Sequence, residues 1–213
     1  MKVLVMAAGK GKRLGSEQTG IPKVMRKACG KPLLHYILSN TDFVGAKDKL
    51  VIVGFKKEVI FETFPFLPHV VQEEQKGTGH AVMCAEEALK DYDGDIMVVN
   101  GDMPLIRRET LLKLSEYHKE KKNDCTILTC VQKEGEIMHY GRILRDENGN
   151  FTGVVEQKDA TEEQKKIQEI NAGIYCFDIQ ELLKALKKIE PNNAQQEYYL
   201  TDVVKIMNEE GLK

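Results

Sequence analysis

Short apolar runs alternate with helix-like stretches through the first half of the chain. Lys2–Ala7, 50–53 and 96–99 are largely apolar segments of strand length, and 33–41 has the spacing of a helix. Buried strands separated by helices are typical of right-handed βαβ crossovers. The pattern therefore predicts an α/β fold with a mostly parallel, Rossmann-like sheet flanked by helices, and ligands at the carboxyl ends of the strands.

The pattern changes in the second half of the chain. A helix from about 105 to 121 is followed by a strand at Cys125–Val131. From Tyr140 onward the spacing predicts a hairpin, with Asn148 and Gly149 forming a type I′ turn. This part is interpreted as a small antiparallel lobe.

Two pairs of residues have capping-box spacing: Thr161 with Gln164, and Asp178 with Glu181. The second pair opens a predicted helix with an apolar stripe that we interpret as core packing. The stripe consists of Ile179, Leu182, Leu183, Leu186 and Ile189.

Composition narrows the class of protein. The 213 residues are 42% hydrophobic and 30% charged, which is ordinary for a globular domain. No apolar run reaches the roughly 18 residues of a membrane span, and the first strand is too short for a signal peptide. We therefore expect a cytoplasmic protein. Five cysteines without a C-x-x-C pair indicate neither a disulfide framework nor a zinc site.

Charge is distributed unevenly. The net charge of −2 argues against a protein built to coat nucleic acid. Residues 1–31 nevertheless hold a single acid, Glu17, against eight bases: Lys2, Lys10, Lys12, Arg13, Lys23, Arg26, Lys27 and Lys31. No aromatic residues for stacking bases are interleaved with them, which makes a nucleic-acid binder the weakest hypothesis.

A glycine-rich segment, MAAGKGKRL at 6–14, follows the first strand. Its small residues allow backbone amides to approach a phosphate or a base, and Arg13 and Lys23 can neutralise a polyphosphate. The segment matches neither G-x-G-x-x-G, whose third glycine would fall on Leu14, nor a Walker loop. A tight turn with surface lysines is the alternative.

A second segment, NGDMPL at 100–105, follows the strand at 96–99. Asp102 would face the ligand crevice, and a single carboxylate suits Mg²⁺, which takes its other oxygens from waters and phosphates. Alone, Asp102 is equally interpretable as a turn former.

A third segment, QEEQKGTGHA at 72–81, lies between a strand and a helix that ends near Leu89. The Gln72 amide can read a pyrimidine, and Gly77 and the helix-start amides can contact a base or phosphate. An ordinary polar loop is the alternative. His80 is interpreted as a helix residue with a satisfied side chain rather than a base.

Four further segments occur in one order: YGRI at 140–143, VEQKDAT at 155–161, QEINAGI at 168–174 and NNAQQEYYLTD at 192–202. With the three loops above, they make the chain resemble the uridylyltransferase domain of the bacterial bifunctional N-acetylglucosamine-1-phosphate enzymes. The resemblance extends from Val3 to about Gly211.

The resemblance implies the nucleotide-diphospho-sugar transferase fold and a single domain. It assigns nucleotide binding to about 1–130, sugar binding to about 131–213, and no β-helix acetyltransferase domain. The implied reaction joins UTP to N-acetylglucosamine 1-phosphate with Mg²⁺, giving UDP-N-acetylglucosamine, a peptidoglycan precursor, and pyrophosphate. The partners would be these small molecules, with no nucleic acid and no membrane, and the oligomeric state stays open.

The same resemblance assigns roles to individual residues. The uridine nucleotide would be held by Ala7, Ala8, Gly9, Gln72, Gly77 and Thr78. Arg13 and Lys23 would steady the triphosphate, and Asp102 would bind the metal. The sugar phosphate would be held by Gly141, Glu156, Asn171 and Thr201.

The chain also departs from the family pattern. Lys12 and Ala172 stand where threonine is usual, and the spacing between Arg13 and Lys23 is longer. The sequence stops at Lys213, before the segment that carries a second metal ligand in the family, so we expect nucleotide binding with slow turnover. Transfer to another sugar or from another nucleotide, and a nucleotide-sugar-binding module with little activity, are the alternatives.

Overall fold

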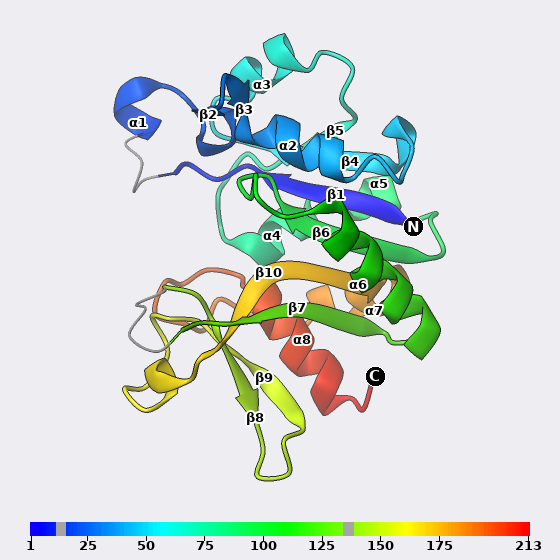
Figure 1. The fold of residues 1–213 in the computed structure, drawn as a ribbon, viewed down its shortest axis with the longest axis vertical. Coiled ribbons are helices and arrows are strands. Elements are labelled where there is room, and N and C mark those ends of the chain that lie inside the picture. Colours follow the sequence, from blue (N-terminus) through cyan, green and yellow to red (C-terminus); the bar gives the residue numbers. More distant parts are fainter. Residues whose placement is uncertain (12–15, 134–138) are drawn as a thin grey trace.

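The computed structural model describes residues 1–11, 16–133 and 139–213, and its centre is one large sheet (Figure 1). The described strands form an eight-stranded sheet in the order β5-β4-β1-β6-β10-β8-β9, with β7 paired to β10. The sheet strands are β1 (Lys2–Ala7), β4 (Lys49–Val53), β5 (His69–Val71), β6 (Asp95–Asn100), β7 (Cys125–Val131), β8 (Arg142–Arg145), β9 (Phe151–Val155) and β10 (Glu169–Asp178). A separate hairpin pairs β2 (Lys27–Ala28) with β3 (Lys31–Pro32).

Helices lie on both faces of this sheet. The α-helices are α1 (Ser16–Thr19), α2 (Leu33–Asn40), α3 (Lys57–Thr63), α4 (Thr78–Met83), α5 (Glu86–Leu89), α6 (Arg108–Lys121), α7 (Ile179–Leu186) and α8 (Leu200–Glu209). Short 3₁₀ turns are η2 (Lys23–Met25), η3 (Ala46–Asp48) and η4 (Gln164–Lys166). Within the described ranges, none of the helices combines the length and apolar character that a bilayer crossing requires.

The parallel part of the sheet is built around β1. Its neighbours β4 and β6 run parallel to it, and Leu4 lies opposite Leu50 on one side and Val98 on the other. β10 then pairs antiparallel with β6 and β7, and its register with β7 shifts between Asn171 and Tyr175. The mostly parallel α/β fold with an antiparallel lobe is confirmed.

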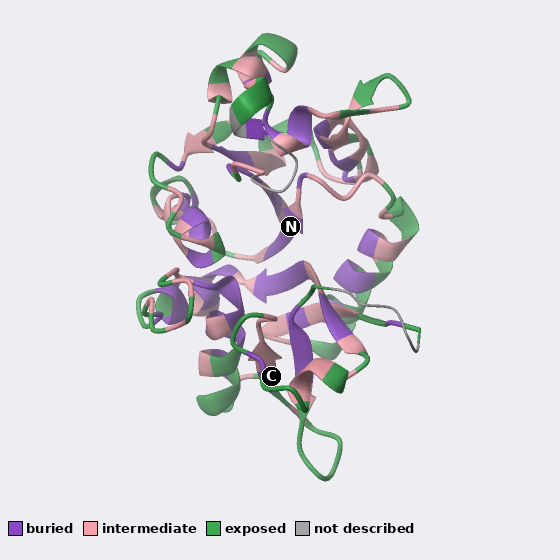
Figure 2. Cartoon of the chain, turned by 90° about the vertical axis from the view of Figure 1, so that its left-hand side faces the viewer, coloured by how far each residue is buried: buried purple, intermediate pink, exposed green. Residues whose placement is uncertain are grey.

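Side chains from alternate positions of the strands fill two cores. One face packs against α2 and α6, and its buried residues include Val3, Val5, Leu34, Ile37 and Leu111. The other face packs against α4, α5, α7 and α8, and its buried residues include Leu4, Val82, Leu89, Leu182 and Val203. In Figure 2 the strands through the middle of the molecule are buried, whereas the tip of the β8–β9 hairpin is exposed.

The hairpin turn differs from its prediction. A type I′ turn needs positive φ at both central residues, but of the two only Gly149 has it, at 81°. Instead, Gly149 N donates to Asp146 O, and the Asp146 carboxylate accepts hydrogen bonds from the backbone of Asn148 and Asn150. The type I′ prediction was wrong because it took no account of the Asp146 side chain, which organises the loop.

The structure also tests the two predicted helix caps and the predicted apolar stripe. Thr161 and Gln164 exchange the two hydrogen bonds of a capping box, although the helix they open is only the short η4. Asp178 Oδ1 accepts from Gln180 N and Glu181 N at the start of α7, but Asp178 N donates to Asp124 O instead of Glu181, so only half of the predicted capping box forms. All five stripe residues of this region are buried, which confirms the core-packing interpretation.

Candidate active site

The ends of the parallel strands bring the three predicted loops together. Gly101 N donates to Met6 O at 2.9 Å, which joins the loop after β6 to the end of β1. Phe55 N donates to Ala8 O at 3.3 Å, and Gln72 N donates to Val53 O at 2.8 Å. The glycine-rich loop, the Asp102 loop and the Gln72 loop therefore lie at one edge of the sheet, as the topology of the strands requires.

In the glycine-rich segment, Ala7 and Ala8 are buried and Gly9 is exposed. Gly11 has a φ of +63°, and a Cβ built there would lie 2.8 Å from Lys23 Cβ. This position thus needs glycine both for its backbone conformation and for the close approach of Lys23. Arg13 lies outside the residues that the structure describes.

Lys23 and Asp102 form an ion pair at this edge. Asp102 follows β6, and Lys23 begins η2, directly after Pro22. Their side chains are 43% and 23% exposed, so both remain accessible to a ligand. The pair places a cation and an anion next to each other at the carboxyl ends of the parallel strands.

Gln72 is 3% exposed, and its amide is held in one orientation. Nε2 donates to Gly77 O at 3.1 Å and lies 3.0 Å from Nδ1 of His80. A carbonyl oxygen only accepts hydrogen bonds, so the amide atom of Gln72 that faces Gly77 O must be Nε2 and not Oε1. Oε1 accepts no hydrogen bond from any described residue and remains available.

His80, the neighbour of Gln72, was interpreted from the sequence as a helix residue whose side chain has its hydrogen-bond partners within the protein. Burial lowers its pKa, with a further contribution from Lys76, whereas Glu74 acts in the opposite direction. A neutral imidazole with Nδ1 unprotonated can accept the second Nε2 hydrogen of Gln72. The geometry thus supports the interpretation of His80 as a structural residue rather than a base.

The predicted sugar residues gather around the antiparallel lobe. Thr201 Oγ1, at the start of α8, donates to Glu156 Oε1 at 3.1 Å. Asn171 N donates to Gly141 O at 2.9 Å, and a Cβ built at Gly141 would lie 3.5 Å from Glu156 Oε2. Burial raises the pKa of Glu156, and nearby Asp159 and Asp202 add to the effect, against the opposing hydrogen bond from Thr201.

Two residues that the sequence did not single out connect these groups. Asn100, at the end of β6, donates through Nδ2 to Gly173 O at 3.1 Å. Gly173 N donates to Asn171 Oδ1 at 2.9 Å, and Asn171 Nδ2 donates to the Tyr175 hydroxyl at 2.6 Å. The strand-end position of Asn100 beside Asp102 was a usable signal, whereas the Tyr175 contact depends on the β10 bulge and left no sign in the sequence.

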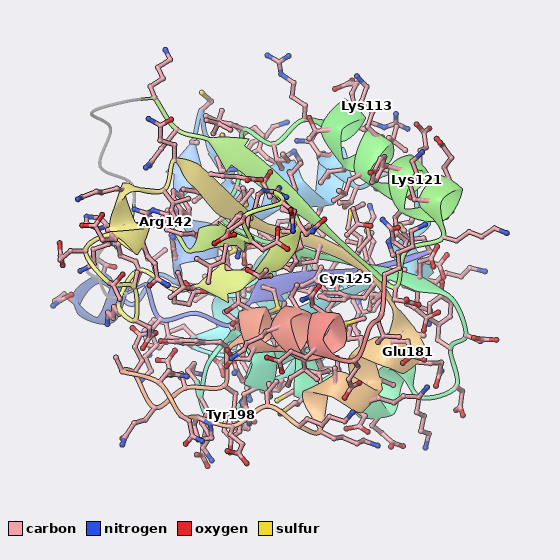
Figure 3. All side chains as sticks on the ribbon, turned by 90° about the horizontal axis from the view of Figure 1, so that it is seen from below. Lys113, Lys121, Cys125, Arg142, Glu181 and Tyr198 are labelled. Carbon is pink, nitrogen blue, oxygen red and sulfur yellow. The ribbon has the colours of Figure 1, made fainter. Side chains whose placement is uncertain are left out.

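Residues of the two halves of the chain can be located in Figure 3. Figure 3 places Arg142, on the hairpin lobe, and Tyr198, just before α8, toward one end, with Lys121 and Glu181 toward the other. No cluster of three or more His, Cys, Asp or Glu side chains that could hold a metal occurs among residues 1–11, 16–133 and 139–213. Asp102 and Glu156 are the carboxylates among the described residues of the predicted site.

Comparison with known proteins gives this geometry a context. The chain matches the nucleotidyl transferase family over residues 2–213. It is 46% identical to the bifunctional protein GlmU of Clostridioides difficile over 213 residues, 100% of this chain and 45% of that protein. It is 45% identical to the GlmU protein of Caldanaerobacter subterraneus over 211 residues, 99% of this chain and 45% of the relative. The chain thus spans less than half the length of these relatives.

A solved structure shares the fold. A UDP-glucose pyrophosphorylase complexed with UDP-glucose superposes with a TM-score of 0.78 at 18% identity, covering 100% of this chain and 88% of the other. The match to the family model covers almost the entire sequence and includes every loop described above. The chain therefore belongs to the nucleotidyl transferase family.

Proposed function

We propose that this nucleotidyltransferase transfers a uridylyl group from UTP to N-acetylglucosamine 1-phosphate, giving UDP-N-acetylglucosamine and pyrophosphate. The identity to GlmU proteins along the whole chain supports this assignment. In it, residues 1–130 bind the nucleotide and 131–213 bind the sugar phosphate. The expected cytoplasmic location stays a prediction.

The observation that carries the proposal is the orientation of Gln72. Nε2 donates to Gly77 O and lies 3.0 Å from Nδ1 of His80, which accepts the second hydrogen when that nitrogen is unprotonated, so the buried side chain presents Oε1. An acceptor at this position suits the N3–H of uracil, whereas cytosine has a lone pair at N3 and would face it with a second acceptor. A site that leaves a polar group unpaired with the wrong ligand discriminates strongly against that ligand.

The reaction needs charge neutralisation more than proton transfer. The nucleophile is a phosphate oxygen of the sugar phosphate, which is already an anion and attacks the α-phosphorus in line as pyrophosphate leaves. Lys23 would steady the polyphosphate, as would Arg13, and the buried loop backbone at Ala7 and Ala8 would orient the nucleotide. No general base and no covalent intermediate are required.

Enzymes of this kind generally use a divalent metal, and we propose Mg²⁺ held by Asp102. The donor set fits that ion, because Mg²⁺ keeps several waters and combines one or two carboxylates with substrate phosphates. When bound, Mg²⁺ would supply positive charge to phosphate oxygens. Asp102 also pairs with Lys23, the residue proposed to steady the polyphosphate.

The sugar half offers both donors and acceptors. Glu156 would accept hydrogen bonds from sugar hydroxyls, and its contact with Thr201 leaves its second oxygen, Oε2, beside Gly141. Asn171 and Thr201 are themselves buried, so their side chains are held in place by the surrounding protein. These four residues support recognition of a neutral sugar carrying a phosphate.

The test is pyrophosphate release measured with the four common ribonucleoside triphosphates and dTTP, each against several sugar 1-phosphates, with Mg²⁺. We expect the fastest release from UTP with N-acetylglucosamine 1-phosphate, and at least about tenfold slower release with CTP, given the cost of an unpaired buried group. Faster release from dTTP or GTP, or with another sugar, would point to a thymidylyl or guanylyl transferase. Binding of UTP without release from any pair would indicate a binding module.

A further inference from the structure

The first turn of α8 is capped from a distant part of the chain. Tyr199 occupies the N-cap position, and its side chain makes no hydrogen bond to the helix-start amides. Instead, Leu200 N donates at 3.0 Å to the hydroxyl Oγ1 of Thr78, 122 residues earlier. Since Ser and Thr hydroxyls satisfy exposed helix-start amides in this way, Thr78 acts as the cap that α8 lacks locally.

The backbone around Thr78 is clamped to the same segment. Tyr198 N donates to Lys76 O and Gly79 N donates to Tyr198 O, both at 2.8 Å. A Cβ built at Gly77 would lie 2.4 Å from Tyr198 O, and Gly77 has a φ of +113°. The segments around Thr78 and Tyr198 are thus in direct contact, and the Thr78 hydroxyl is held toward α8.

The capped turn carries a sugar-site residue. Thr201 directly follows Leu200, is 3% exposed, and donates to Glu156 at 3.1 Å. A displacement of the α8 start would therefore move Thr201 and release Glu156. Helix ends whose caps are lost fray within the first turn, which is the turn that holds Thr201.

We propose that the Thr78 hydroxyl is a positioning group for the sugar half of the site rather than a contact to the nucleotide. It fixes the first turn of α8 and, through Thr201, the orientation of Glu156. The proposal deepens the proposed function and rests on it for the identity of the sugar phosphate. It revises the sequence-based assignment of the Thr78 side chain to nucleotide binding.

The test compares two replacements of one side chain in the same protein. Thr78→Val keeps the shape and removes the hydroxyl, whereas Thr78→Ser keeps the hydroxyl. We expect Thr78→Val to raise the KM for the sugar phosphate by about three- to tenfold, the range of one net hydrogen bond. Its Kd for UTP should change less than about twofold, and Thr78→Ser should resemble the wild type in both. Weaker UTP binding with an unchanged sugar KM would overturn the proposal, as would equal effects of Val and Ser.

A double-mutant cycle that combines Thr78→Val with Thr201→Val tests whether Thr78 acts on Glu156 through Thr201. Because both replacements interrupt one path to Glu156, the sugar KM of the double variant should rise by clearly less than the product of the single effects. Fully multiplicative effects would mean that the two hydroxyls act independently and would contradict the route.

A measurement without substrate separates this proposal from the proposed function. Hydrogen exchange of the amides at 199–203 in the free protein should be faster in Thr78→Val than in wild type and in Thr78→Ser. Unchanged exchange in Thr78→Val would overturn the capping role. If the wild type releases no pyrophosphate with any sugar, the proposed function fails while the exchange result still decides whether Thr78 holds α8.

Discussion

At the scale of the single residue, Gln72 is distinguished by what its amide already binds. Gly77 O takes one Nε2 hydrogen and His80 Nδ1 lies next to the same nitrogen, so Oε1 is the atom left for a base. We expect Gln72→Ala to weaken UTP binding by about 1 to 3 kcal/mol, since a buried N–H of the base would lose its acceptor. Pyrophosphate binding should be unaffected. Isothermal titration calorimetry with both ligands measures the difference.

Glu73→Gln is the matched control, because this neighbour is exposed and pairs only with Lys57 among the described residues. Its affinity for UTP should equal that of the wild type. Unchanged UTP affinity in Gln72→Ala would show that Gln72 is only part of the loop structure.

Asp102 forms an ion pair with Lys23, and its proposed role is to bind Mg²⁺. Asp102→Asn keeps the shape of the side chain and removes the charge that would attract Mg²⁺. Turnover should then fall by at least about a hundredfold, the scale of losing a preorganised electrostatic group. Rates measured across a Mg²⁺ titration check this, and near-normal Mg²⁺-dependent activity would exclude Asp102 as the metal ligand. Asp42→Asn, which removes a surface ion pair with Arg108, serves as the control and should keep the wild-type rate.

At the scale of elements, α6 is joined to the sheet by a buried histidine. His118 is 1% exposed, its Nδ1 lies 2.9 Å from Thr126 Oγ1 of β7, and its Nε2 lies 3.6 Å from Asp95 Oδ1 of β6. Burial lowers the pKa of His118 below the usual value for histidine, about 6.5, although Asp95, Asp178 and Asp124 oppose the shift. The folded protein therefore binds the proton less readily than the unfolded chain.

The sign of the pH dependence follows from this difference. As the pH falls below about 6.5, the unfolded His118 takes up a proton that the folded one does not, so the contribution of this residue to stability is lost until the folded pKa is reached. We expect the free-energy difference between wild type and His118→Gln to shrink from pH 7.5 to pH 5. Urea unfolding at both values measures it, and a constant difference would contradict the assignment.

Helices and strands could be predicted where the local spacing of apolar residues determines them. β1 and β7 have the bounds that apolar patterning predicts, and the stripe along α7 is buried as expected. The helix predicted to end near Leu89 is divided into α4 and α5. Patterning alone did not reveal the long-range contacts of the site, because a hydrogen bond such as Thr78 to Leu200 joins segments whose local sequences are independent of each other.

At the scale of the whole molecule, the two proposed parts share one sheet and contribute residues to both of its cores. β10, from the second part, pairs with β6 of the first, and α7 and α8 pack with α4 and α5 against the same face. Neither part can therefore lose its structure without exposing apolar surface of the other. A hydrogen bond from Asn100 to Gly173 O also joins the two parts.

We accordingly expect a single cooperative unfolding transition, as is usual for one domain of this size. The chain lacks tryptophan, but Cys176 in β10 is fully buried and reports on the second part by its reactivity toward a thiol reagent. Far-UV circular dichroism follows all helices and strands. In urea, the midpoint from Cys176 labelling should coincide with the midpoint from circular dichroism, and UTP should shift both together, because a ligand that binds only the folded state stabilises all of it. If Cys176 became reactive at lower urea than the main circular dichroism transition, the sugar-binding part would be an independent unit, and the shared core would not couple the two halves.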